Sequence, residues 1–463
     1  MSGGRRFRIA DLFCGAGGSS MGAYRAFGYG PEIAINHWPY AIEQHGINHP
    51  ECQHYNASVF DIAPERFFRE DPRTGQTRGM DVLMMSPECK HHSIAKGSAP
   101  LDAGRRAQAE VAYAWAECAH PPKLIIVENV KEFESWGPVS EDGKRDLSQA
   151  GAYFRPWVER LRAAGYTVDW RTLLASDYGA PQARLRLYVV ASRAGAPCWP
   201  VPTHGPGRPN AYRTAADILD WDIEVPSILG RKKPLCDATQ RRIAQGIQRF
   251  VLERPPYLRR LSTDERPPKT DLVAAFMVRH FTGAQGTSLH APLATVTSHD
   301  HNALVVARLS DAAQLHASGD TLAACWLNRA YGNGQPDAIT EPLGTVTAGD
   351  GHSALCYAFL TKYYTGAANG GRPGTVQGQS LLEPLDTVPT KHRFGLVTLH
   401  VGDTVRAITD IGMRFLTPTE LARAQDMSEF IFTGSVTDRN EAIGNAVVPC
   451  VMEALLRANA HHL

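Results

Sequence analysis

The sequence lacks the features of a membrane-spanning, secreted or zinc-stabilised protein. No apolar run in its 463 residues approaches the length of a membrane span, and the basic first six residues lead into an expected strand without the apolar region of a signal peptide. The nine cysteines form no C-x-x-C pair and no regular cysteine/histidine spacing, which excludes the usual patterns of a disulfide framework or a structural zinc site. We therefore expect a cytoplasmic monomer with no membrane contact and no bound metal.

A strong excess of charge of one sign is also missing. The formal net charge is +1, so a nucleic-acid partner would be bound by a local concentration of basic residues and not by the protein as a whole. What is present is an ordinary globular composition, 43% hydrophobic and 21% charged, in a chain long enough for two domains.

The first sixty residues are predicted to form three strands whose ends carry ligand-binding residue types. Residues 6–10 lead into the turn Asp11-Leu-Phe-Cys-Gly-Ala-Gly-Gly, and a helix is expected to begin near Met21. A second strand, 32–35, ends in Asn36-His37-Trp38, and Phe60-Asp61-Ile62 marks the end of a third. Glycines let the backbone approach a ligand, and a helix N-terminus presents free N–H groups. The series suits an adenosine bound in a doubly wound α/β fold, although a tight turn without a ligand would show the same glycine pattern.

A cysteine follows the next buried strand. The apolar run 82–85 ends at Ser86-Pro87, and the loop after it carries Cys89. Ligands bind at this edge of an open α/β sheet, and a thiol there can act as a nucleophile. A buried structural cysteine is the alternative explanation.

Two further stretches place polar residues at strand ends. Residues 123–130 are predicted to form a buried strand with Glu128 near its end, where the alternative is a surface glutamate in a loop. Gln182, Arg184 and Arg186 alternate, so a single strand would place all three on one face. The segment 104–119 is rich in helix-forming residues and is expected to be a helix.

These motifs, in this order, resemble the DNA cytosine-5 methyltransferase family. The matching segments cover about the first two hundred residues and the last fifty. They are Asp11-Leu-Phe-Cys-Gly-Ala-Gly-Gly, Pro-x-Cys89, Glu128-Asn129-Val130, Gln182-x-Arg184-x-Arg186, Arg414-x-Leu-Thr-x-x-Glu420-x-x-Arg423-x-Gln425 and Gly444-Asn445-Ala446-Val447. The resemblance implies a Rossmann-like α/β domain that uses S-adenosylmethionine, and a second, smaller β-rich target-recognition domain.

The resemblance also implies a role for each matched residue. Cys89 would add to C6 of a cytosine flipped out of double-stranded DNA, and Glu128 would bind or protonate N3, so that C5 attacks the methyl group of S-adenosylmethionine. Arg184 and Arg186 would hold the base oxygen and the nucleophile loop. The residues implied to surround the cofactor are Phe13, Gly15, Gly17, Gly18, His37, Trp38, Asp61, Ile62 and Asn445.

Three places depart from the family pattern. His37 stands where the family has a glutamate that binds the ribose hydroxyls, and a neutral imidazole can bond a hydroxyl with less charge assistance. Glu88 and Lys90 flank the nucleophile and act on the thiol pKa in opposite directions, which leaves the net direction open. His91 and His92 invite a metal or protease site, which we disfavour because adjacent histidines point in different directions.

The middle of the chain contains an internal repeat. Three stretches that combine aromatic and basic residues align, and each is followed by a Pro-Leu-x-Thr-Val segment; the stretches begin at Phe276, Trp326 and Phe359. We expect three β-hairpin-like units packed side by side as the DNA-recognition region. Arg279, Arg329 and Lys362 occupy the same position in each unit and are predicted to contact DNA. The alternative is that they are solvated edge charges over an aromatic core.

The predicted organisation has four parts. These are a catalytic domain over 1–225, a connector over 226–275 with one helical piece at 239–252, a repeat-containing target-recognition domain over 276–408, and a C-terminal segment over 409–463 that returns to the catalytic domain. In that last segment Thr417, Pro418 and Glu420 predict a capped helix start, and a final helix is expected over 449–458.

The predicted activity is methylation of cytosine C5 within a specific duplex sequence, as in restriction-modification systems. Two alternatives stay open: an RNA (tRNA) cytosine-5 methyltransferase and a catalytically silent DNA-binding relative. The large repeat region argues against the first, and the presence of Cys89, Glu128 and Arg186 argues against the second.

Overall fold

The computed structural model describes residues 6–72, 74–87, 107–138, 146–228, 231–233, 235–262, 270–279, 286–298, 302–311, 326–329, 337–338, 353–354, 360–362, 377–379, 398–401 and 404–463. The chain divides into two compact units. Unit 1 consists of Met1–Ile218, Pro292–Asp300 and Thr417–Leu463, and unit 2 consists of Leu219–Ala291 and His301–Leu416. Each unit is therefore assembled from separate stretches of the sequence.

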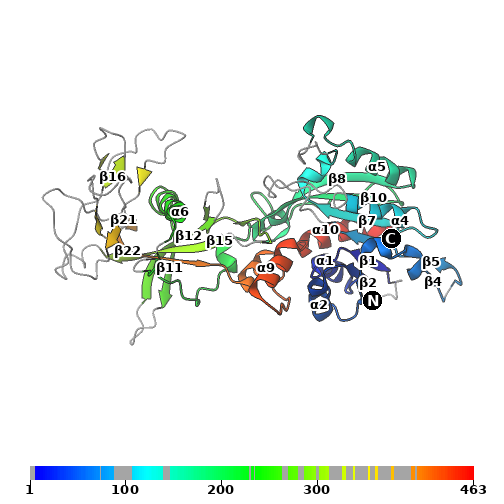
Figure 1. Ribbon diagram of the computed structural model, residues 1–463, viewed down its shortest axis with the longest axis horizontal. Coiled ribbons are helices and arrows are strands. Elements are labelled where there is room, and N and C mark those ends of the chain that lie inside the picture. The colour runs from blue at the N-terminus through cyan, green and yellow to red at the C-terminus, as the bar shows by residue number, and fades with distance from the viewer. Residues whose placement is uncertain are drawn as a thin grey trace. The chain divides into compact units, whose positions relative to one another are not determined.

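A seven-stranded sheet forms the centre of unit 1 (Figure 1). Its strands in spatial order are β3 (Gln53–Asn56), β2 (Ile33–Asn36), β1 (Ile9–Leu12), β6 (Val82–Met85), β7 (Leu124–Asn129), β10 (Leu185–Ser192) and β8 (Thr167–Leu174). The first five are parallel, and β10 runs antiparallel to both of its neighbours. From β1 the chain moves to β2 on one side and later to β6 on the other, so the topological switch point lies between β1 and β6. This order confirms the predicted Rossmann-like α/β fold.

Both faces of this sheet are buried. The α-helices among the described residues of unit 1 are α1 (Gly18–Phe27), α2 (Pro39–Asn48), α4 (Val111–Ala116), α5 (Phe154–Ala163), α8 (Pro418–Ala424), α9 (Val436–Asn445) and α10 (Pro449–Asn459). Alternate strand residues face two different cores: Leu83 and Ile125 join the side chains of α4 and α5, whereas Val82 and Leu124 join those of α1 and α10. Because the central strands are covered on both faces, β6 and the first four residues of β7 are continuous apolar runs in the sequence.

The C-terminal stretch of unit 1 begins with a capped helix. The Thr417 hydroxyl accepts a hydrogen bond from the Glu420 N–H at 3.2 Å, and the Glu420 carboxylate accepts one from the Thr417 N–H at 2.8 Å. This confirms the predicted capping box. The final helix, α10, confirms the other prediction for this stretch and packs closely against α1, since a β-carbon at Gly22 would touch Met452.

Three elements of unit 1 differ from the sequence-based expectation. The helix expected over 104–119 is a 3-10 turn at Ala107–Glu110 followed by the short helix α4. The third strand ends at Asn56, and Asp61 lies in the 3-10 helix Val59–Asp61, because the Ser58 hydroxyl accepts the Phe60 N–H and starts a turn there. The run that contains Gln182, Arg184 and Arg186 is two strands and not one, because β9 (Gln182–Ala183) leaves the main sheet to pair with β14 (Leu293–Ala294).

Unit 2 is built on a second, mainly antiparallel sheet. The strands in order are β11 (Tyr257–Ser262), β12 (Thr270–Arg279), β15 (Asn302–Asp311), β22 (Thr404–Phe415) and β21 (Thr398–Val401), with β13 (Thr287–Ser288) beside β12. Helix α6 (Asp237–Ile247) continues as a π-helix to Leu252, which confirms the helical piece expected over 239–252. Gly246 of α6 lies directly against the Phe276 ring of β12. Because α6, β11 and part of β12 belong to unit 2, most of the stretch 226–275, which was expected to be a connector, lies inside this unit.

The first repeat does not form the expected hairpin. Phe276 on β12 is buried in the core of unit 2, and β12 pairs with β11, β13 and β15. The Pro-Leu-x-Thr-Val segment of this repeat forms β14, which pairs with β9 in unit 1. The expectation of three equivalent hairpins is therefore wrong for this copy, because both edges of β12 already have other partners. The corresponding segments of the other two copies, 342–346 and 384–388, lie outside the described residues.

Short strand pairs follow in the other two copies. Strand β16 (Trp326–Arg329) pairs with β17 (Asp337–Ala338) and β18 (Ser353–Ala354), and β19 (Leu360–Lys362) pairs with β20 (Gln377–Gln379). Across the described part of the chain, no helix is long and apolar enough to cross a membrane.

Candidate functional site

The parallel strands of unit 1 all end at one edge of the sheet, and most residues predicted to bind the cofactor follow these ends. The glycine turn follows β1, His37 and Trp38 follow β2, and Ser86 and Pro87 follow β6. Glu128 and Asn129 close β7 at the same edge. Since the switch point between β1 and β6 opens a crevice here, this edge is the candidate functional site.

The turn after β1 has an unusual backbone that leaves space above it. Phe13 has a φ of 56°, a left-handed conformation that costs a non-glycine residue about 1–3 kcal/mol and is concentrated at functional sites. Gly15 and Gly17 also have positive φ, at 54° and 106°. A β-carbon at Gly15 would meet no atom within 4 Å, so a ligand can approach the backbone there. The Ser86 hydroxyl donates to the Phe13 carbonyl at 3.3 Å, which connects this turn to the loop after β6.

The other two glycines of the turn are required by packing. A β-carbon at Gly17 would lie 2.6 Å from the His49 ring, whose Nε2 is 3.1 Å from the Gly17 carbonyl oxygen. A β-carbon at Gly18 would overlap the carbonyl oxygen of Val447. The motif that contains exposed Asn445 therefore runs directly beside the start of α1, the arrangement expected if both segments surround one ligand.

The residues predicted to face the adenosine have mixed exposure. His37 is exposed, and Trp38 is half-buried with its ring 5.3 Å from that of Tyr40. Asp61 is exposed and Ile62 is buried. An exposed imidazole, a half-buried indole and an exposed carboxylate offer hydrogen-bonding and stacking groups to a nucleoside.

Glu128 and Arg186 form a largely buried ion pair. Because β10 is antiparallel to β7, the start of β10 lies beside the end of β7. Arg186 Nε is 3.2 Å from Glu128 Oε1, and the two side chains are only 16% and 8% exposed. Next to this pair, the Asn129 amide donates to the Pro87 carbonyl at 3.3 Å, which fixes the beginning of the predicted nucleophile loop.

Cys89 itself lies outside the described residues, as do Glu88, Lys90, His91 and His92. The described chain reaches Pro87, two residues before the cysteine, at the same edge as Glu128. The assignment of Cys89 as the nucleophile stays a prediction.

Arg184 has a different environment from Arg186. It is buried, and its Nη1 donates to the carbonyl oxygens of Val296 and Gly444, both at 3.1 Å. These carbonyls belong to two segments of unit 1 that are far apart in sequence. Arg184 therefore holds the 292–300 segment and the Asn445 motif together, a role that the family resemblance alone did not indicate.

Two buried glutamines, Gln182 and Gln425, bind the same two segments as Arg184. Gln182 accepts the Val296 N–H at 3.0 Å and donates to Gln425, which in turn donates to the Ala446 carbonyl at 2.7 Å. Both glutamines stand in the matched motifs, which was the only signal in the sequence for their importance.

A buried carboxyl beneath the turn was missed by the sequence analysis. Asp11 is fully buried at the end of β1, and this burial raises its pKa to about 7. The Ser20 hydroxyl donates to Asp11 at 2.7 Å and lies 2.9 Å from His45 Nε2, and burial lowers the pKa of His45. This chain of polar contacts joins β1, α1 and α2 under the glycine turn. The signal in the sequence was an aspartate inside an otherwise apolar strand.

The predicted DNA-contacting residues all lie in unit 2. Arg279 closes β12 and is partly buried, and this burial lowers its pKa. Arg329 and Lys362 belong to β16 and β19, and their side chains are outside the described part of the structure. Their contact with DNA stays a prediction.

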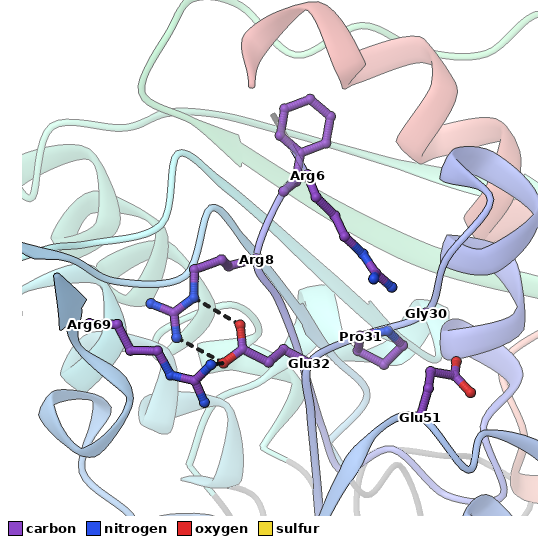
Figure 2. A pocket seen from close by; sticks show the side chains of 8 residues that line it. Arg6, Arg8, Gly30, Pro31, Glu32, Glu51 and Arg69 are labelled. Carbon is purple, nitrogen blue, oxygen red and sulfur yellow. Dashed lines mark hydrogen bonds and ion pairs between the residues drawn. The ribbon is translucent and has the colours of Figure 1, made fainter. Parts of the chain in front are cut away.

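A charged pocket lies at the opposite edge of the sheet, where β1 and β2 begin (Figure 2). In this pocket the Glu32 carboxylate accepts a hydrogen bond from Arg8 Nε at 2.8 Å and forms an ion pair with Arg69 at 2.9 Å. The residues that line the pocket are Arg6, Phe7, Arg8, Gly30, Pro31, Glu32, Glu51 and Arg69. Since ligands of this fold class bind at the carboxyl ends of the strands, we do not assign this pocket to the cofactor.

Comparison with known proteins identifies what the chain is similar to. Residues 7–236 match the family model described as C-5 cytosine-specific DNA methylase. The chain is 30% identical over 214 residues to Type II methyltransferase M.XorII of Xanthomonas oryzae, covering 45% of this chain and 46% of that protein. It is 33% identical over 189 residues to Type II methyltransferase M.AgeI of Thalassovita gelatinovora, covering 41% of this chain and 40% of that protein. The chain thus spans less than half the length of these two relatives.

Proposed function

Because the chain belongs to the DNA cytosine-5 methyltransferase family, we propose that it methylates C5 of a flipped-out cytosine in a specific duplex DNA sequence, with S-adenosylmethionine as methyl donor. The observation that carries this proposal is the largely buried Glu128–Arg186 pair at the sheet edge where the glycine turn also lies. The names of the relatives, Type II methyltransferases, support a place in restriction-modification.

The residues at the sheet edge fit S-adenosylmethionine. The open space above Gly15 and the N-terminus of α1 suit the methionine moiety, whose carboxylate is favoured near free helix N–H groups. Trp38, His37 and Asp61 offer the stacking surface and polar groups that an adenosine needs. When bound, the cofactor supplies a methyl group on a positively charged sulfur, which makes that carbon electrophilic.

The chemistry assigned to the protein begins with activation of the base. Cytosine C5 is a weak nucleophile because the ring electrons are delocalised. Addition of the Cys89 thiolate to C6 makes C5 enamine-like. Glu128 donates a hydrogen bond or a proton to N3 and so stabilises the electrons that move onto the ring. Arg186 keeps the Glu128 carboxylate oriented toward the base. After methylation, loss of the C5 proton and departure of the Cys89 sulfur restore the aromatic ring.

The proposal is tested with duplex DNA that carries 5-fluorocytosine at the modified position. Fluorine cannot leave as the proton does, so the parent protein should form a covalent complex that survives denaturing electrophoresis. Cys89→Ser should bind DNA without forming this complex. A covalent complex that persists in Cys89→Ser would contradict the assignment of the nucleophile.

The substrate class is tested separately. Transfer of a radiolabelled methyl group should occur to duplex DNA and not to tRNA. Transfer to tRNA alone would favour the RNA methyltransferase, and binding to DNA without any transfer would favour a silent relative.

A further inference from the structure

One cysteine and two histidines converge on unit 1 away from the candidate site. Cys198 lies in the chain after β10, and His461 and His462 lie in the 3-10 helix Ala460–His462 that follows α10. Their three potential ligand atoms all lie within 4.8 Å of one another. Cys198 Sγ is 3.8 Å from His461 Nε2, close to the separation of about 3.6 Å that a sulfur and a nitrogen ligand have on a tetrahedral zinc ion.

His462 is held in the tautomer that a metal ion requires. His462 Nε2 lies 3.0 Å from the Ala196 carbonyl oxygen, which can only accept a hydrogen bond, so this nitrogen carries the proton. Its Nδ1 therefore presents a lone pair. A hydrogen bond from the second ring nitrogen to a carbonyl is the usual support of a metal-bound histidine.

The cysteine is also fixed by its surroundings. The buried Asn459 side chain accepts the Cys198 N–H and donates to the Cys198 carbonyl, both at 2.8 Å. These two bonds attach the backbone of Cys198 to Asn459 at the end of α10. Since His461 and His462 follow shortly after Asn459 in the chain, the thiol is fixed next to both histidines. Cys198 and His461 are exposed, which leaves a path for an ion and room for a water ligand.

A second group of the same kind is less suited to a metal. Within the described residues, His45, Cys52 and His54 also converge. There, however, His45 Nδ1 and His54 Nε2 are 2.8 Å apart and bond each other, and His45 Nε2 is engaged by Ser20. A metal would have to replace a complete hydrogen-bond chain there, whereas at Cys198 it would replace the longer sulfur contacts, at 3.8 Å to His461 Nε2 and 4.0 Å to the Ala196 carbonyl.

We propose that Cys198, His461 and His462 bind a divalent ion of the zinc class, with water as the fourth ligand. One sulfur and two nitrogen ligands are the donor set that zinc prefers. The bound ion would clasp the end of α10 to the segment after β10 and so stabilise the packing of the C-terminal stretch on unit 1.

The test is a cobalt titration of the full-length protein followed by zinc competition. Co²⁺ bound to this set should give a near-ultraviolet thiolate band and the strong visible bands of a tetrahedral ion, saturating at one equivalent. Excess Zn²⁺ should remove these bands and raise the melting temperature. Cys198→Ala should abolish the thiolate band and the thermal shift, and His461→Gln should weaken cobalt binding at least tenfold.

Two matched variants separate this site from other thiols. Cys236 is an exposed cysteine that is not part of either cluster, and Cys52 belongs to the competing cluster. Cys236→Ala and Cys52→Ala should keep the full cobalt spectrum. The proposal is overturned if the thiolate band survives Cys198→Ala, if it is lost in Cys52→Ala, or if the parent protein gives no saturable spectrum.

Discussion

Gly18, the first residue of α1, lies directly against the backbone carbonyl of Val447. A β-carbon at Gly18 would overlap the carbonyl oxygen, and the neighbouring atoms are also backbone. Because backbone cannot rotate away as a side chain can, the glycine turn and the C-terminal stretch of unit 1 are in contact without room for even one methyl group.

We therefore predict that Gly18→Ala destabilises the protein by about 1–3 kcal/mol, the usual cost of overpacking, and weakens binding of S-adenosylmethionine. Denaturant unfolding and calorimetric cofactor titration measure the two effects. The matched control is Gly46→Ala in α2, where a β-carbon would meet only the His54 ring at 3.8 Å. That change should be neutral or stabilise by up to about 1 kcal/mol. Equal stability of the two variants would contradict the close approach.

Arg184→Met should destabilise unit 1 because it leaves the carbonyls of Val296 and Gly444 without their shared donor. Loss of two buried hydrogen bonds to a charged group costs about 2–5 kcal/mol. Arg171→Met, at a 58% exposed side chain on β8, is the control and should change stability little. Proteolysis within 292–300 should be faster in Arg184→Met, and an unchanged rate would show that the segment is held by other contacts.

Asp11 should make stability fall as the pH rises. Its pKa is raised from 3.8 to about 7 in the folded protein. Between pH 4 and pH 7 the unfolded chain has already released this proton while the folded protein has kept it, so the unfolded state is increasingly favoured. The loss levels off above pH 7 and amounts to at most about 4 kcal/mol.

Asp11→Asn stays neutral and should lack this decline. The gain in stability of Asp11→Asn over the parent should therefore grow from pH 4 to pH 7, measured by denaturant unfolding at each pH. Taking the difference removes the opposite slope that His45 and His49 contribute, since burial lowers their pKa values. Glu65→Gln, which also replaces a carboxylate by an amide but at an exposed position, is the matched control. A difference that is constant with pH would rule out a neutral Asp11 in the folded state.

Glu128→Gln should reduce the methylation rate by about 10²–10⁴-fold while leaving the fold intact, because the amide keeps the shape of the carboxyl but cannot transfer its proton. Single-turnover methyl transfer at saturating DNA measures this, and Glu159→Gln at a 66% exposed site is the control. Parental activity in Glu128→Gln would remove this residue from the mechanism.

The sheet edge was predictable because its signals are local. The central strands are short apolar runs that give way to polar residues, as at Met85–Ser86 after β6 and at Glu128 and Asn129, which close β7. The capping box at Thr417 was visible for the same reason. Asp61 was misplaced by this rule, because a 3-10 turn begun by Ser58 looks in the sequence like the end of a strand.

Contacts between distant segments could not be read from local patterns. The repeat around Pro292 looked like part of a hairpin, yet its Leu293 and Ala294 pair with β9, and only that pairing shows why Arg184 is needed. Adjacent histidines were expected to point in different directions, yet the rings of His461 and His462, in one 3-10 helix, have centroids only 4.0 Å apart. Two adjacent histidines can therefore lie in one site.

The discontinuity of unit 1 also has a consequence during synthesis. Arg25 of α1 bonds Glu429, 404 residues later, and α1 packs against α10. At a ribosomal rate of about 5–20 residues per second, the nascent chain waits roughly 20–80 s before these partners exist. During that time the surface that α10 will cover, which includes Ala23 of α1 and Val82 of β6, is exposed. We expect a chaperone to shield this surface on the ribosome and to leave only after α10 has emerged.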